Sequence, residues 1–186
     1  MKMRRLFFTT IFIISLSFIS FAQTSTRLKI DKNTLIYLFG DFIEINKKQK
    51  MNNIERIEYQ TTRCFGTCPQ FNIVIEKSKN ATFNAQHHNR KDKNEKEIKG
   101  KYKTIIKDED FDLIVNALND IDFPNLKDKY TTGHRDTQAC FLTITYNEGK
   151  VKKIKDYGLS GTSGLKKLYD LMFELRFNQK WEKEKK

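Results

Sequence analysis

The chain has 186 residues, of which 38% are hydrophobic and 12% aromatic, and a formal net charge of +12 at pH 7. This length suffices for one domain with a single buried core, and the sequence contains no internal repeat or low-complexity tract. The positive charge can attract polyanions, but most of the lysines alternate with Glu or Asp and lack interleaved aromatic residues, so the sequence carries no specific nucleic-acid signal.

Residues 1–22 have the pattern of a secretory signal peptide. Three basic residues precede the apolar run 6–21, and Ser20-Phe21-Ala22 forms a small-x-small cleavage site before Gln23. The apolar run is short for a membrane span, which favours cleavage over an uncleaved N-terminal anchor. We therefore predict an exported protein, periplasmic or secreted, with no membrane span after the signal peptide is removed.

Residues 23–53 form an N-terminal extension in which neither helical nor strand periodicity dominates. From residue 54 the pattern sharpens, because apolar side chains alternate with polar ones as in half-buried strands. We predict a single domain over residues 54–178, followed by a charged tail at 179–186 that frays into solvent. The predicted strands cover residues 54–62, 71–75, 81–86, 98–106, 140–146 and 151–157.

Two amphipathic helices complete the predicted domain. Asp108 has the character of an N-cap, and Pro124 closes off the first helix. The second helix follows the glycine-containing segment 158–164, where Ser160, Thr162 and Ser163 are available as caps. Meandering strands with two such helices indicate an α+β fold, a mainly antiparallel sheet of about six strands with both helices on one face. The core-facing stripes are Phe111, Ile114, Val115 and Leu118, and then Leu165, Leu168, Tyr169, Met172 and Leu175.

The connection between the first two strands contains Cys64-Phe65-Gly66-Thr67-Cys68-Pro69, with two of the three cysteines and one of the two prolines. In an extended strand, Cα atoms four residues apart would be roughly 13 Å apart. A disulfide needs about 4.4–6.8 Å. A bond between Cys64 and Cys68 therefore requires the backbone to fold back, which Gly66 permits and which Pro69 can end at the start of the next strand.

Three states of this cysteine pair remain open from the sequence. A structural disulfide is favoured in an exported protein, a redox or soft-metal site is the second interpretation, and two unpaired thiols are the third. The spacing is not the C-x-x-C of thioredoxin-like enzymes, and no second Cys/His pair has zinc-finger spacing. Cys140 lies on the apolar face of its predicted strand, which indicates a buried thiol.

Other polar residues are weaker candidates for a site. Adjacent strand residues point to opposite faces, so His87-His88 is interpreted as surface histidines rather than a metal site. No nucleophile is linked by spacing to His134-Arg135-Asp136, and we predict no catalytic, cofactor-binding or metal-binding residue. Asp128, Asp136 and Asp156 can meet at one end of the sheet, with Tyr157 beside the last of them, although turn capping is the simpler interpretation.

The run Arg63–Pro69 followed by Phe71–Ile75 resembles the opening of a bacterial family, domain-of-unknown-function family 6438. Residues 123–130, Asp136 and Asp156-Tyr157 are similar to its pattern as well. The resemblance covers about residues 54–177 and implies an exported or envelope-attached protein of small α+β fold. It implies no reaction.

We therefore expect a non-enzymatic binding or structural domain of the cell envelope, with an envelope protein or a polyanion as the possible partner and no cofactor. Two alternatives are a thiol-redox or copper-handling protein that uses Cys64 and Cys68, and a polyanion-binding module that uses the basic surface.

Overall fold

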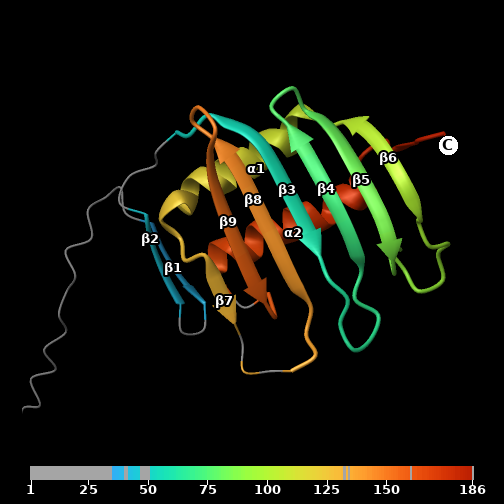
Figure 1. Ribbon diagram of the computed structural model, residues 1–186, viewed down its shortest axis with the longest axis horizontal. Helices are drawn as coiled ribbons and strands as arrows, with labels where there is room; N and C mark the ends of the chain where they lie inside the picture. Colours follow the sequence, from blue (N-terminus) through green and yellow to red (C-terminus); the bar gives the residue numbers. More distant parts are fainter. Residues whose placement is uncertain are drawn as a thin grey trace, which may run out of the picture.

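The computed structural model describes residues 51–131, 133, 135–159 and 161–185, together with the backbone of two short strands at 35–39 and 42–46. Within these residues, an eight-stranded sheet is covered on one face by two helices (Figure 1). The strand order is β10-β6-β5-β4-β3-β8-β9-β7, and every neighbouring pair is antiparallel except β7 with β9. The predicted α+β fold, with a mostly antiparallel sheet and helices on one face, is confirmed.

The six predicted strands are all present, with small shifts at their ends. Alternation of buried and exposed side chains follows each of the central strands, as the sequence pattern predicts. Their bounds are β3 (Ile54–Thr61), β4 (Gln70–Glu76), β5 (Asn80–His87), β6 (Gly100–Ile105), β8 (Ala139–Tyr146) and β9 (Lys150–Tyr157).

Two further strands lie at the edges of the sheet and were not predicted. β7 (Lys129–Thr131) lies inside the segment expected to be a polar connection, and it pairs in parallel with β9. β10 (Glu182–Lys183) pairs with β6, and the Trp181 ring lies 5.2 Å from the ring of Phe83. The prediction that the tail frays is therefore wrong for its described part, because Trp181 anchors it to the core.

The N-terminal extension contains a separate antiparallel hairpin of β1 (Leu35–Phe39) and β2 (Phe42–Asn46), which the sequence pattern did not reveal. β1 lies close to α2. The predicted signal peptide at 1–22, its cleavage site and the rest of 23–50 lie outside the described residues. Among the described residues, no helix combines the length and apolar character that a membrane span requires.

The helices α1 (Asp108–Asp120) and α2 (Ser163–Asn178) lie where the sequence placed them. The N-cap of α1 is Lys107 rather than Asp108, because the helix already begins at Asp108. In the first turn, the negative carboxylate of Asp108 interacts favourably with the positive end of the helix dipole. The α2 cap is Thr162, whose Oγ1 accepts a hydrogen bond of 3.2 Å from the Leu165 N–H. Pro124 lies in η1 (Phe123–Asn125), a 3₁₀ turn that follows α1.

The core lies between the helices and the covered face of the sheet. Side chains from the central strands interlock there with Ile114 and Leu118 of α1 and with Leu168 and Met172 of α2. Tyr59 stacks on Tyr169 with ring centroids 5.6 Å apart, which joins β3 directly to α2. This packing fixes the ends of the strands, and the connections at those ends carry the residues singled out in the sequence.

Candidate functional site

The connection between β3 and β4 is a small loop closed by a disulfide. Cys64 and Cys68 are bonded, with their Cα atoms 5.7 Å apart, within the range that a disulfide requires. Gly66 has a φ of 154°, a backbone conformation that a side chain would disfavour. The fold-back that the sequence predicted is therefore present, and of the three open states of the cysteines the structure shows the disulfide.

Hydrogen bonds join this loop to the end of the sheet. The Thr61 hydroxyl donates to the carbonyl oxygen of Pro69 at 2.7 Å, and the Gln138 side-chain amide donates to the same oxygen at 2.6 Å. The Phe65 N–H donates to the carbonyl oxygen of Asp136 at 3.1 Å. Thr61 and Gln138 are buried, so the base of the loop is rigid while its tip faces solvent.

The tip of the loop presents Phe65, which is 93% exposed and the most exposed large apolar side chain in the described part of the chain. Gly66 and Thr67 beside it are also exposed. In Figure 1 the β3–β4 connection lies at the lower end of the sheet, with the end of β5 beside it. A single large apolar side chain is thus held in water at the tip of a loop whose base is fixed.

Two exposed arginines lie on the two segments that meet at the disulfide loop. Arg63 is exposed, donates to the Gln70 side chain at 3.1 Å and contacts the ring of His87 through its guanidinium. Arg135, on the loop before β8, is exposed as well. The site therefore combines one exposed apolar residue with two exposed arginines and the exposed Asp136.

The three aspartates that the sequence placed at one end of the sheet have different partners. Asp136 lies at the disulfide loop and has a φ of 57°. Asp128 forms an ion pair with Lys152 at 2.6 Å. Asp156 is fully buried and accepts a hydrogen bond of 2.9 Å from the Gly161 N–H, so it stabilises the loop before α2. Tyr157 is half-buried at the end of β9, where it pairs with Ala139.

Cys140 is a buried thiol, as predicted. It lies on the covered face of β8, next to the hydroxyl groups of Tyr59 and Tyr169. Burial raises the pKa of the Cys140 thiol to about 12, so the thiol stays protonated and unreactive at neutral pH.

His87 and His88 are not arranged as two ligands of one metal ion. His87 ends β5 and contacts Arg63, whereas His88 follows with a φ of 55° and its ring centroid 6.4 Å away. No group of three His, Cys, Asp or Glu side chains among the described residues is placed to hold a metal ion. His134 lies outside the described residues.

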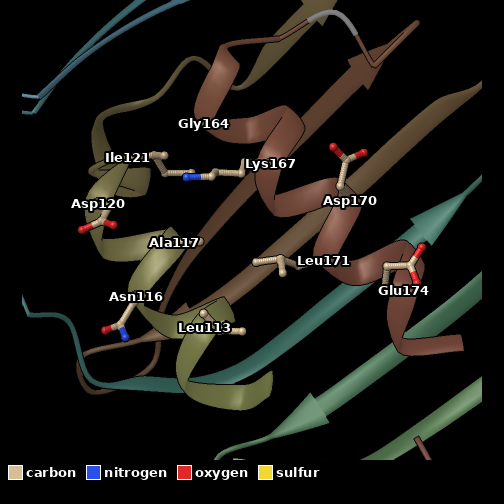
Figure 2. Close-up of a pocket in the computed structure, with 10 residues that line it drawn as sticks. All are labelled: Leu113, Asn116, Ala117, Asp120, Ile121, Gly164, Lys167, Asp170, Leu171 and Glu174. Atoms are coloured by element: carbon tan, nitrogen blue, oxygen red, sulfur yellow. The ribbon is translucent and has the colours of Figure 1, made fainter. Parts of the chain in front are cut away.

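A second concave region lies on the outer side of the helices and was not predicted. It is a groove of about 350 Å³ between α1 and α2 (Figure 2). Leu171 and Lys167 reach from α2 toward Ile121 and Ala117 of α1 across the floor. The rim is acidic, with Asp120, Asp170 and Glu174, so the groove contrasts with the positive charge of the whole chain. The helical stripes used for prediction reveal only the faces turned to the sheet.

A family model, that of a domain of unknown function (DUF6438), matches the chain over residues 55–176. This range includes the disulfide loop, both helices and seven of the strands in full or nearly so, from β3 to β9, but neither the β1–β2 hairpin nor β10. No curated protein matches the chain.

Proposed function

The chain belongs to the DUF6438 family, and we propose that it is a non-enzymatic binding domain that works outside the cytoplasm, in the cell envelope or beyond it. The observation that carries the proposal is Phe65, fully in solvent at the tip of a loop that the Cys64–Cys68 bond closes. The proposed partner is a protein of the envelope with an apolar pocket and an acidic border.

Preorganisation is the physical reason for this choice. Binding normally costs conformational entropy when a loop becomes ordered, and a loop already fixed at its base loses less. The disulfide and the bonds from Thr61 and Gln138 to Pro69 supply that fixation. A large aromatic side chain surrounded by polar groups is the usual composition of an interface centre, with Arg63 and Arg135 at its border.

Export is the second part of the proposal. It is supported by the basic start, the short apolar run and the small-x-small site of residues 1–22, and by a disulfide, which persists in oxidising compartments. N-terminal sequencing of the protein recovered from the periplasm or the medium should place Gln23 first. Recovery of intact residues 1–22 in a membrane fraction would instead indicate an N-terminal anchor.

The interaction itself is tested by capture from an envelope extract with three baits: the wild type, Phe65→Ala and Ile105→Ala. Ile105 is a matched control, since it is another exposed apolar side chain, at 68%, on β6. We expect a protein retained by the wild type and by Ile105→Ala to be lost with Phe65→Ala. Equal capture by all three baits contradicts a role for Phe65.

The two other functions considered predict different behaviour. A redox or copper-handling protein would cycle Cys64 and Cys68 between bonded and free states, which thiol titration and metal analysis of the purified protein detect. A polyanion-binding module would show binding to heparin that falls steeply with salt. Neither assay depends on Phe65, so a Phe65→Ala variant separates both functions from the proposed one.

A further inference from the structure

Arg176 on α2 is a buried cation without a carboxylate partner. Its side chain lies among three aromatic rings, with the guanidinium carbon 4.7 Å from the ring centroid of Phe71, 4.8 Å from that of Phe173 and 4.6 Å from that of Phe177. Arg176 is 7% exposed, and none of the ion pairs within the described part of the chain includes it. A buried charge is normally paired, so this one is unusual.

The hydrogen bonds of Arg176 leave one side of the guanidinium open. Nε donates to the carbonyl oxygen of Phe173 at 2.9 Å, and Nη1 makes a long contact of 3.4 Å with Oδ1 of Asn89. Nη2 has no partner among the residues that the structure describes. It is not one of the fully enclosed unpaired atoms either, so Nη2 keeps some exposed surface. Two of the five N–H donors of the side chain are thus used.

Asn89 holds the guanidinium of Arg176 in place. Asn89 is fully buried, and its side-chain amide donates to the carbonyl oxygens of Gln70 at 2.8 Å and His87 at 3.0 Å. These bonds connect the end of β5 to the start of β4, so Asn89 and Arg176 form one rigid unit. A ligand would meet a preformed donor and not a flexible surface side chain.

The charges around Arg176 favour an anion. Burial lowers the pKa of Arg176 to about 10, so the guanidinium stays positive at neutral pH. Glu174, two positions before it on α2, is exposed, and its negative charge acts to raise the pKa of Arg176 without forming an ion pair within 4 Å. Glu97, on the loop after β5, is paired with Lys99 at 3.0 Å and accepts the His88 N–H. Arg90 and Lys91 directly follow the end of β5 and add positive charge there.

We propose that the open edge of Arg176 binds the carboxylate of a small molecule whose adjacent group is aromatic or apolar and packs on Phe173 and Phe177. A carboxylate supplies the acceptors that the guanidinium lacks, in the geometry that arginine binds best. Phe173 and Phe177 are half-buried, and their ring centroids lie 4.8 Å and 4.6 Å from the guanidinium carbon. The site is on the helix side of the sheet and does not depend on the proposed role of Phe65.

Benzoate is the probe, and benzyl alcohol, which has the ring without the charge, is the matched ligand control. Both are titrated into the isotopically labelled full chain at constant ionic strength, and backbone amide shifts are followed by NMR. We expect benzoate to shift the amides of Asn89, Phe173 and Phe177 in a saturable manner and benzyl alcohol to leave them nearly unchanged. Shifts confined to the lysine-rich outer strands, or no saturable shift, overturn the proposal. This measurement uses the wild-type chain and so does not depend on any variant folding.

The Arg176→Met variant keeps the length and apolar packing of the side chain and removes its charge. Benzoate affinity should fall on the order of tenfold or more, as expected for the loss of a hydrogen bond to a charged group. Lys153→Met, on the uncovered face of β9, removes the same charge elsewhere and should leave the affinity unchanged. An equal loss in both variants would mean that benzoate responds only to net charge, which overturns the proposal.

Discussion

The Phe65 N–H donates a hydrogen bond of 3.1 Å to the carbonyl oxygen of Asp136. This bond joins the disulfide loop to the segment before β8, which is distant in the sequence. Together with the Gln138 bond to Pro69, it positions the loop independently of the covalent link between Cys64 and Cys68. The disulfide therefore tightens a loop that the sheet already holds.

The first prediction concerns the double change Cys64→Ser and Cys68→Ser. A closed loop this small restricts the unfolded chain only slightly, so the free energy of unfolding should fall by about 2 kcal/mol. The corresponding decrease in Tm is roughly 4–8 °C, measured by calorimetry, and the circular dichroism spectrum should stay unchanged.

Peptide mapping without reductant is the companion measurement on the wild type. It should yield a fragment that links Cys64 to Cys68 and a separate one with free Cys140. A bond from either loop cysteine to Cys140, or loss of the folded state in the double variant, would refute the assignment of a local, modestly stabilising disulfide.

The second prediction compares two phenylalanines on either side of the same loop. Phe65 is 93% exposed, so Phe65→Ala should change the free energy of unfolding by no more than about 0.5 kcal/mol. Phe71 is buried against Phe83 and Arg176, and Phe71→Ala should cost about 3–5 kcal/mol. Urea denaturation measures both. A large loss with Phe65→Ala would show that the ring is not in solvent.

The third prediction concerns Gly161, where a Cβ atom would lie 2.6 Å from Oδ2 of Asp156 and 2.9 Å from Cδ1 of Leu165. Both neighbours are buried, so Gly161→Ala should destabilise the fold by roughly 1–3 kcal/mol. Gly133 is the matched control, since a Cβ atom added there would meet nothing within 4 Å, and Gly133→Ala should be close to neutral. Equal stability of the two variants in thermal melts would argue against the tight contact at Asp156.

The fourth prediction follows from the buried Cys140 thiol. It should resist iodoacetamide in the native protein and react after denaturation, as tested by mass spectrometry of the native and denatured samples. Rapid labelling of the native protein would contradict the placement of Cys140 on the covered face of β8.

The same thiol gives the fifth prediction, a dependence of stability on pH. The pKa is raised from 9.0 to about 12 by burial, so above pH 9 the unfolded chain loses this proton while the folded chain keeps it. The contribution of Cys140 to stability is thus complete below pH 9 and declines as the pH rises toward 12, by up to about 1.4 kcal/mol per pH unit.

Urea denaturation of the Cys64→Ser, Cys68→Ser protein, with and without Cys140→Ala, isolates this contribution and avoids thiol–disulfide exchange. The parent should lose stability relative to the Cys140→Ala protein between pH 9 and 11. Burial is the largest cause of the raised pKa of Tyr59 and of Tyr169, and it acts in both proteins, so this part of their titration cancels in the difference. Parallel curves would mean that the thiol is not desolvated.

Much of the fold follows from local pattern. The alternation in residues 54–61 and 70–76 and the helical stripes ending at Leu118 and Leu175 each match an element of the structure. β7 could not be predicted in this way, because three residues are too few to show a period and its pairing with β9 is set by the chain packed around it. β10 could not be predicted for the same reason, and the charged residues around it indicate a solvent-exposed segment.

Part of the candidate site could likewise be predicted from the sequence, and part could not. The spacing of Cys64, Gly66 and Cys68 indicates a closed turn, and the structure contains it. The outward direction of Phe65 could not be predicted, since an aromatic residue between two cysteines is as compatible with burial as with exposure. Arg176 looks like a solvent-facing residue in the sequence, and only the convergence of Phe71 from β4 with Phe173 and Phe177 from α2 encloses it.

The two edge strands have a consequence for the behaviour of the protein at high concentration. An unpaired sheet edge can recruit an identical strand from another molecule and so start aggregation. Here β7 and β10 are three and two residues long, too short to template such an addition. The part of β9 that β7 leaves uncovered carries the exposed Lys150 and Lys153, whose like charges repel a second copy. The domain is thereby protected against strand-to-strand self-association at both ends of its sheet.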